Sequence, residues 1–279
     1  MLERMRPLLG TFVTVRAEVG AADANQVFAA AFGAIEQVQT CLSFHDPDSE
    51  LSRVNHSAAS AAQALSPLFA RVLRASLALA RLSDGCFDPT IGARLVRWGQ
   101  LPAPDASRPD EAADWRDVRL LEGHQLRFSR PLWLDFGGIA KGYAVDRAVA
   151  ALKALGVRQG SVNAGGDLRV FGDQPQTIHV RHPGSPAQSI PLLQLTEGAV
   201  ATSAGYFSAR SGYTALVDTR SAQPMGEGVS VTVVARRAIW ADALTKIVLS
   251  GHASAPGLLR RLDAQAVCID RSGQTTRVG

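Results

Sequence analysis

Helical and strand-like apolar patterns follow one another along this chain without the regular strand–helix–strand order of a doubly wound sheet. Period-two alternation at 11–16 and a β-rich run at 229–235 predict strands. Apolar residues at helical spacing over 23–42 predict a helix that Asp23 caps. The irregular mixture favours an α+β fold, with mixed or antiparallel sheets, packed helices and two closely associated lobes.

The remaining elements follow from the same periodicities and from glycine and proline positions. A second helix begins at Ser66-Pro67 and ends before Gly85. Further helices are predicted at 140–155, 238–250 and 256–263, and further strands at 118–121, 125–128, 161–171, 177–182, 191–196, 213–218 and 266–270. The Pro- and Asp-rich stretch 99–117 predicts a surface connector within a single domain covering 1–279.

Composition excludes several classes of protein. Hydrophobic residues make up 46% and charged residues 19% of the 279 positions, enough for a buried core. The net charge of +4 comes from scattered arginines, which argues against a nucleic-acid surface but suits an anionic ligand such as a dinucleotide. Three cysteines without a CxxC pair predict reduced thiols.

The sequence also bears on location. No apolar run reaches the roughly 18–20 residues of a membrane span, and the opening MLERMRPLLGTF lacks the apolar core of a signal peptide. We therefore expect a cytoplasmic protein, or a periplasmic one if the N-terminus has been trimmed. The oligomeric state is left open.

The segment LDFGGIAKGY at 134–143 is the most informative for chemistry. A β-run ends at paired glycines and opens a helix, the layout that points backbone N–H groups at an anion. Lys141 adds a positive charge there. The alternative is a tight turn that needs glycine only for its backbone angles. A second glycine turn follows Asn163, and Asn163 and Asp167 are expected to cap it.

Spacing leaves other candidates open. Asp242 and Lys246 are four residues apart on a predicted helix, which favours an ordinary salt bridge, whereas Asp242 and Thr245 together suit a hard cation such as Mg²⁺. Phe44 suits stacking on a planar ring or, as spacing favours, a place in the core. His179 and His182 point to opposite faces of a strand and predict no shared metal site.

Several motifs together resemble the ApbE family, the FAD:protein FMN transferases, in order and over nearly the whole chain. They are Leu9-Gly10-Thr11-Phe12, Asp48 to Asn55, FDPTIG at 87–92, LVRWG at 95–99, LDFGGIAKGYAVD at 134–146, VNAGGDLRVFG at 162–172, Ala201-Thr202-Ser203, Val217-Asp218 and Ala241-Asp242-Ala243-Leu244.

The resemblance implies an ApbE-like fold that binds FAD between its lobes. It also implies Mg²⁺-assisted transfer of FMN from FAD to a Thr or Ser hydroxyl of a target flavoprotein, with release of AMP. By motif match, Asp242 and Lys141 carry catalysis, and the metal ligands are the Ala140 carbonyl and Asp242, with Thr245 in a shifted shell. The implied FAD site consists of Leu9, Phe44, Cys86, Phe87, Asp88, Lys141 and Val217.

Three positions depart from the family pattern. The Thr that usually follows the metal Asp by four residues is Lys246 here, with Thr245 one residue earlier. The usual His of the HxxDP segment is Ala215, and the acidic residue of the SGDY-like segment is missing at Ala204-Gly205.

The departures keep two alternative functions open. One is a non-catalytic FAD-binding or flavin-delivery protein, in which the Lys246 ammonium takes the place of the metal's charge. The other is an FAD pyrophosphatase that uses water as acceptor and gives FMN and AMP. Both use the same site as the transferase.

Overall fold

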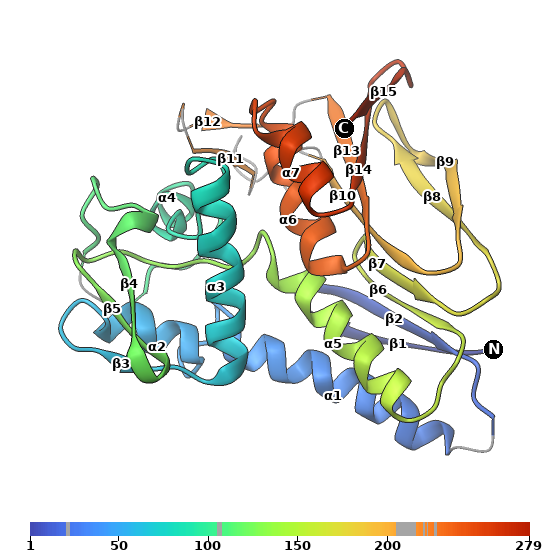
Figure 1. Cartoon of the computed structure of the whole chain (residues 1–279), viewed down its shortest axis with the longest axis horizontal. Helices are drawn as coiled ribbons and strands as arrows, with labels where there is room; N and C mark the ends of the chain where they lie inside the picture. The colour runs from blue at the N-terminus through green and yellow to red at the C-terminus, as the bar shows by residue number, and fades with distance from the viewer. Residues whose placement is uncertain (21–22, 105–107, 205–215, 220, 222, 226–227) are drawn as a thin grey trace. The chain divides into compact units, whose positions relative to one another are not determined.

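The computed structural model describes residues 1–279 except 21–22, 105–107, 205–215, 220, 222 and 226–227 (Figure 1). The chain divides into two compact units. Unit 1 contains Met1–Gln39, Ile139–Tyr206 and Gly226–Gly279, and unit 2 contains Thr40–Gly138 and Phe207–Met225. Each unit is thus assembled from segments that are distant in sequence.

Unit 1 is built on an eight-stranded sheet whose neighbouring strands are all antiparallel, in the order β1-β2-β6-β7-β10-β13-β14-β15. The strands are β1 (Leu2–Leu8), β2 (Thr11–Ala17), β6 (Gly160–Ala164), β7 (Asp167–Phe171), β10 (Gly198–Ala204), β13 (Val229–Ala235), β14 (Gln265–Asp270) and β15 (Thr275–Val278). In β2, Val13 and Val15 are fully buried whereas Phe12 between the turn and Val13 is exposed, as the period-two pattern predicts.

Among the described residues, four helices belong wholly or mainly to unit 1: α1 (Ala24–Leu42), α5 (Ala140–Ala154), α6 (Ala238–Leu249) and α7 (Ala255–Arg261). The helix α5 packs on β6 and β7, and α6 packs beside it on β10 and β13 (Figure 1). The guanidinium groups of Arg4 and Arg6 in β1 lie 4.8 Å from the ring centres of Phe28 and Phe32 in α1.

Unit 1 also carries the hairpin of β8 (Gln176–His182) and β9 (Ser185–Leu195), inserted between β7 and β10. Its buried Ile178 packs against Val170 of β7 and Val200 of β10. The hairpin is therefore tied to the large sheet by its own small apolar cluster.

Unit 2 combines helices with two small sheets. Its helices are α2 (Glu50–Ser57), α3 (Pro67–Leu82), α4 (Gly92–Arg97) and the short 3₁₀ turns η1 (Trp115–Asp117) and η2 (Glu122–His124). Its strands are β3 (Gln63–Ala64), β5 (Gln125–Phe128) and β4 (Val118–Leu121), in that order, with a separate pair of β11 (Val217–Asp218) and β12 (Gln223–Pro224).

Local chemistry explains the main helix of unit 2. The Ser66 hydroxyl accepts the Phe69 N–H at 3.2 Å, and Pro67 stands in the first turn, where no N–H is needed. The Phe69 ring then meets Phe136 edge-on, with centroids 5.4 Å apart. The start of α3 is thereby fixed both by its cap and by its core contact.

The predicted α+β class is confirmed, and most predicted elements lie where expected. Several differ. The run 161–171 is two strands joined by the Gly165-Gly166 turn, and β9 begins six residues before the predicted 191. Of the predicted strand 213–218, residues 213–215 lie outside the described part, and β11 covers only the end. The single-domain boundaries 1–279 stay a prediction.

The segment before the paired glycines is not a strand, contrary to expectation. Asn55 binds both backbone groups of Leu134: its side-chain oxygen accepts the Leu134 N–H at 2.8 Å and its amide donates to the Leu134 carbonyl at 2.9 Å. The Asp135 N–H donates to the Pro89 carbonyl. Since these partners satisfy the backbone, the segment forms no ladder with a neighbouring strand. Within the described ranges, no helix is both long and apolar enough to cross a membrane.

Candidate functional site

The helices α5 and α6 cap each other's N-termini. Asp242 of α6 accepts the Gly142 N–H of α5 at 3.0 Å. In return, Asp146 of α5 accepts the N–H groups of Ala238 at 3.0 Å and Ile239 at 3.2 Å, the first residues of α6. A carboxylate at a helix N-terminus satisfies N–H groups that lack a helical partner and interacts favourably with the helix dipole. The pair of caps fixes both helix starts relative to each other.

Gly142 makes this close crossing possible. A Cβ placed there would lie 2.2 Å from the Ala238 carbonyl oxygen and 2.8 Å from the Cβ of Asp242. Backbone atoms cannot move aside as a flexible side chain can. The glycine of the AKGY sequence is therefore required by helix packing, and it brings the start of α5 against Asp242.

Two ammonium groups gather at the Asp242 carboxylate. The Lys246 Nζ donates to Oδ1 of Asp242 and, at 3.0 Å, to the Asp242 carbonyl. The Lys141 Nζ lies 3.9 Å from the same Oδ1 and donates to Asp167 Oδ2 at 2.6 Å. The predicted salt bridge between Asp242 and Lys246 is thus confirmed. It forms one end of a part-buried row of alternating charges, Lys246, Asp242, Lys141 and Asp167.

Burial and charge act in opposite directions on the two carboxylates. Burial alone would raise the pKa of Asp242, but the Lys141 and Lys246 ammonium groups outweigh it and hold that pKa below its usual range. Burial raises the pKa of Asp167, and the negative charge of Asp242 raises it further, against the attraction of Lys141. Asp242 is therefore the carboxylate that the site keeps ionised.

Hydroxyl groups complete the surroundings of Asp242. The Thr245 hydroxyl donates to the Asp242 carbonyl at 2.6 Å, and its oxygen lies 2.7 Å from the Ser203 hydroxyl of β10. Thr245 is fully buried. Ala140 is the first residue of α5. The three predicted metal ligands Ala140, Asp242 and Thr245 all belong to α5 and α6 of unit 1.

A divalent cation at Asp242 would have to compete with these donors. The Lys246 ammonium already lies against Oδ1, and Oδ2 accepts the Gly142 N–H. A dication about 4 Å from one ammonium group is repelled by roughly 8 kcal/mol at an effective dielectric constant of about 20, twice the value for two unit charges. In the parts of the chain that the structure describes, no three His, Cys, Asp or Glu side chains gather as a metal site. The side chains as they lie do not fit a divalent ion.

The second glycine turn, residues 163–167, includes Asp167 of this cluster and follows the expected structure only in part. Asn163 Oδ1 accepts the Gly166 N–H at 3.0 Å, so its predicted capping role is confirmed. Asp167 has a different role, because its carboxylate is buried and accepts from Lys141. Its spacing from Lys141 along the chain gives no local signal for this pair, and sequence reasoning missed it.

Leu9 lies in the tight turn between β1 and β2. Its φ of +56° falls in the left-handed region, which is unfavourable for a leucine, and Gly10 follows with φ +70°. The Leu9 N–H donates to Gln39 Oε1 at 2.6 Å, which holds the turn. Strained backbone of this kind persists where the surrounding structure enforces it and is often found at functional sites.

The first paired glycines differ from the expected anion cradle. The Gly137 N–H donates to Asp135 Oδ2 at 3.0 Å, so a carboxylate of the same turn already uses one of the expected backbone donors. The turn therefore has one free backbone donor fewer than the sequence pattern predicts.

The other predicted FAD-binding residues belong to unit 2. Phe44, Cys86, Phe87 and Val217 are each buried, with at most 8% of their surface exposed. The Thr219 hydroxyl donates to the Gly85 carbonyl at 2.7 Å, which joins the segment after β11 to the segment 85–88. Within unit 2 the structure thus brings the two predicted segments together.

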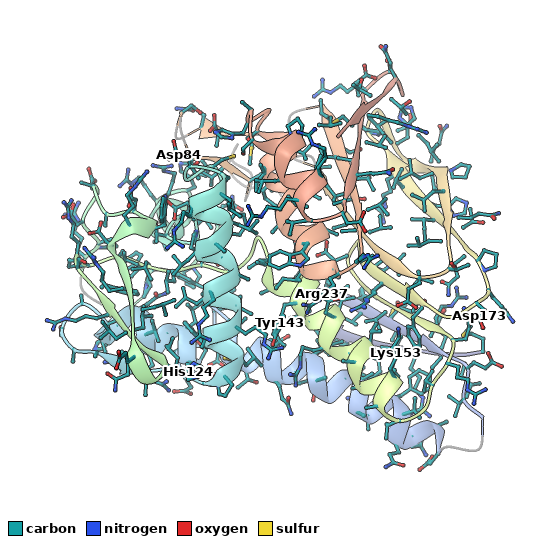
Figure 2. All side chains as sticks on the ribbon, in the orientation of Figure 1. Asp84, His124, Tyr143, Lys153, Asp173 and Arg237 are labelled. Atoms are coloured by element: carbon teal, nitrogen blue, oxygen red, sulfur yellow. The ribbon has the colours of Figure 1, made fainter. Side chains whose placement is uncertain are left out.

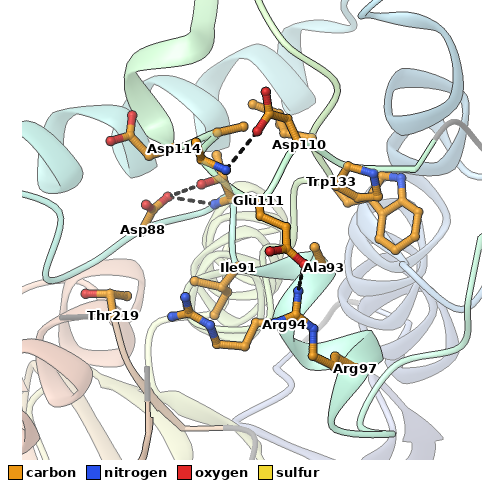
Figure 3. A pocket seen from close by; sticks show the side chains of 15 residues that line it. Asp88, Ile91, Ala93, Arg94, Arg97, Asp110, Glu111, Asp114, Trp133 and Thr219 are labelled. Atoms are coloured by element: carbon orange, nitrogen blue, oxygen red, sulfur yellow. Dashed lines mark hydrogen bonds and ion pairs between the residues drawn. The ribbon is translucent and has the colours of Figure 1, made fainter. Parts of the chain in front are cut away.

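Asp88 lines a cavity of about 390 Å³ within unit 2 (Figure 3). Burial raises the pKa of Asp88, against the Thr90 hydroxyl and N–H that donate to its Oδ1 at 2.6 and 2.8 Å. Arg94 and Arg97 of α4 also line the cavity, and Arg97 pairs with Glu111 at 3.0 Å. Mixed charges of this kind suit a small polar group.

Comparisons with known proteins agree with the sequence patterns. A sequence model of the ApbE family matches residues 9–269. The chain is similar to a protein of Rhodobacter capsulatus named FAD:protein FMN transferase, 32% identical over 222 residues, which cover 72% of this chain but 42% of that relative. A Vibrio cholerae protein of the same name is 29% identical over 268 residues, 88% of this chain and 80% of its own. The chain therefore spans less than half of the first relative's length.

Solved structures show the same fold. The ApbE protein of Thermotoga maritima matches with a TM-score of 0.87 at 27% identity, over 99% of this chain and 96% of its own. The apo flavinyl transferase ApbE of Pseudomonas stutzeri matches with a TM-score of 0.82 at 26% identity, over 99% and 94%.

Proposed function

The chain belongs to the ApbE family, and from that premise we propose that it is an FAD:protein FMN transferase. It moves the FMN part of FAD to a Thr or Ser hydroxyl of a target flavoprotein and releases AMP. The hydroxyl oxygen forms the new bond to the FMN phosphorus, the bond from that phosphorus to the bridging oxygen of the diphosphate breaks so that this oxygen leaves with AMP, and the hydroxyl proton is released to solvent. Catalysis of this kind depends mainly on positioning and on charge at the phosphates.

The observation that carries the proposal is the charged cluster at the start of α5. Lys141 and Lys246 place two ammonium groups at Asp242, beside a helix N-terminus. Positive charge in this position attracts a diphosphate and stabilises the charge that develops on the leaving AMP. Asp242 and Asp167 keep the two side chains in place.

The FAD contacts form part of the same proposal. They are Leu9, Phe44, Cys86, Phe87, Asp88, Lys141 and Val217. The strained turn at Leu9 and the Thr219 bond that joins segment 85–88 to β11 support these positions, because each holds a predicted contact in a fixed place. Mg²⁺ bound by Ala140, Asp242 and Thr245 stays a prediction from the resemblance and is not part of this proposal. A cytoplasmic location also stays a prediction.

A labelling assay tests the function. The purified chain is incubated with FAD and an acceptor protein that bears an Asp-Gly-Ala-Thr sequence, once in EDTA and once with Mg²⁺. We expect a fluorescent acceptor band in denaturing gels and one AMP per FMN attached. Replacing the acceptor Thr by Val should remove the band.

Two outcomes would favour the alternatives. If AMP and FMN are released at the same rate as each other when no acceptor is present, the chain is a pyrophosphatase. Tight FAD binding with an acceptor that stays unlabelled at saturating FAD, in both buffers, would identify a binding or delivery protein and overturn the transferase.

A further inference from the structure

Lysine is rare in this chain, and most of its lysines lie at one place in the fold. The sequence holds three lysines among 29 basic residues, the other 26 being arginines. Two of the three, Lys141 and Lys246, lie within 4 Å of the same oxygen of Asp242. Lysine carries a compact point charge, whereas the planar guanidinium of arginine is larger. A chain that otherwise uses arginine thus has two compact cations at one buried carboxylate.

The cations and anions of this cluster differ in exposure. The side chain of Asp242 is fully buried and that of Asp167 is 5% exposed, whereas Lys246 is 15% and Lys141 33% exposed. The lysine side chains are therefore the members of the cluster that solvent reaches, whereas the carboxylates are buried. The formal charges of the four side chains sum to zero.

We propose that the Lys246 ammonium takes the place of a divalent cation, so that the chain binds the diphosphate of FAD without metal. This inference rests on the proposed function for the identity of the ligand. Lys246 and Lys141 contact the diphosphate oxygens, and Asp242 holds Lys246 from below through its carboxylate and its carbonyl. An anion with two adjacent charges is the ligand class that two neighbouring ammonium groups suit best.

The hydrogen bonds of Lys246 hold its ammonium group in one position. Its Nζ has two acceptors on one residue, and Lys246 lies one helical turn after Asp242 on α6. A pre-oriented donor loses little freedom when a ligand binds. An ammonium group carries three donors, and among the described residues Asp242 accepts two of those of Lys246.

Calorimetry on the intact chain tests the inference directly. FAD is titrated into the protein in excess EDTA and, separately, in millimolar Mg²⁺. We expect dissociation constants that agree within about threefold, because the cation is part of the protein. A loss of more than about tenfold in EDTA would overturn the inference, since a metal would then be supplying the charge.

Variants at position 246 give a second test. Lys246→Met should weaken FAD binding by at least about tenfold in both buffers, the loss of one charge-assisted hydrogen bond. Lys246→Thr should bind weakly in EDTA and regain affinity in Mg²⁺, because a hydroxyl leaves room for the ion. Wild-type affinity in Lys246→Met would refute the inference.

The third lysine provides a matched control. Lys153 lies in the last turn of α5, far along the helix from its start near Tyr143 (Figure 2), and pairs with the exposed Glu197 at 2.8 Å. Lys153→Met removes the same charge and should leave FAD affinity unchanged in both buffers. Thermal melting of each variant shows whether the fold is kept.

The two proposals can fail separately. Metal-independent FAD binding without any labelled acceptor supports the role of Lys246 and overturns the transferase. Labelling that requires Mg²⁺, with binding lost in EDTA, supports the transferase and overturns the role of Lys246. Absence of FAD binding in both buffers overturns both.

Discussion

The substitution Gly142→Ala tests the close crossing of α5 and α6 on which the site depends. The added methyl carbon would lie 2.2 Å from the Ala238 carbonyl oxygen, whereas ordinary contact begins near 3.4 Å. The two helices must therefore separate by about 1 Å. That movement also pulls the Gly142 N–H away from Asp242, its acceptor at 3.0 Å.

Competing effects decide the sign of the change. Alanine in a helix interior is ordinarily more stable than glycine by about 0.5–1 kcal/mol. Overpacking against backbone costs about 1–3 kcal/mol, and a weakened hydrogen bond to a charged group costs about 1.5–3 kcal/mol. The net loss is about 2–5 kcal/mol, which corresponds to a fall in Tm of roughly 5–15 °C for a chain of this size.

Thermal melting followed by circular dichroism measures the effect, with Gly33→Ala as the control. Gly33 lies within α1, and a Cβ there meets no atom within 4 Å. We expect Gly33→Ala to leave Tm unchanged or to raise it slightly. An unchanged or higher Tm in Gly142→Ala would show that the helices are not held at the distance described.

Three further predictions concern buried polar groups. Asp146→Ala should lower the free energy of unfolding by about 3–5 kcal/mol in urea titrations, because the part-buried Arg169 loses its buried partner, whereas Glu36→Ala, which breaks an exposed pair, should cost less than about 1 kcal/mol; equal losses would contradict this. Asn55→Ala should lower the free energy of unfolding by about 2–4 kcal/mol in the same titration, since two buried backbone groups of Leu134 lose their partner. A loss below about 1 kcal/mol would contradict this role of Asn55. Burial raises the pKa of the Cys41 thiol to about 12, so about one thiol in ten thousand is ionised at pH 8; peptide mapping after iodoacetamide treatment should find Cys41 labelled only in urea, and fast labelling of the folded protein would argue against its burial.

Local pattern predicted the elements whose burial alternates regularly. The strand β2 and the helices α1 and α3 each show one buried face in their sequence, whereas α5 and α6 are buried on most sides. The strand β1 shows none, because it lies at the sheet edge and Leu2 and Met5 are exposed. The eight-residue α2 is too short for a clear period and relies on its Ser49 cap.

The same division applies to the candidate site. The pair Asp242–Lys246 is local to one helix turn, so spacing alone predicts it. The pair Lys141–Asp167 joins a helix to a strand 26 positions away, and only the order of the strands brings them together. Gly142 is visible as a glycine in sequence, but its reason, the Ala238 backbone beside it, is visible only in the fold.

The charges of this cluster explain why the departure from the family pattern at Lys246 need not abolish diphosphate binding. With Lys246, the two lysines balance Asp242 and Asp167, and the lysine side chains are more exposed than the carboxylates. With a neutral residue at 246, the same cluster would carry one net negative charge and would repel a diphosphate until a dication reversed that sign. With both the lysine and a dication, the cluster would carry two positive charges in a buried setting, where like charges repel strongly. A fixed ammonium group and a bound metal ion are therefore alternative solutions to one electrostatic problem, and a residue that supplies the first removes the need for the second.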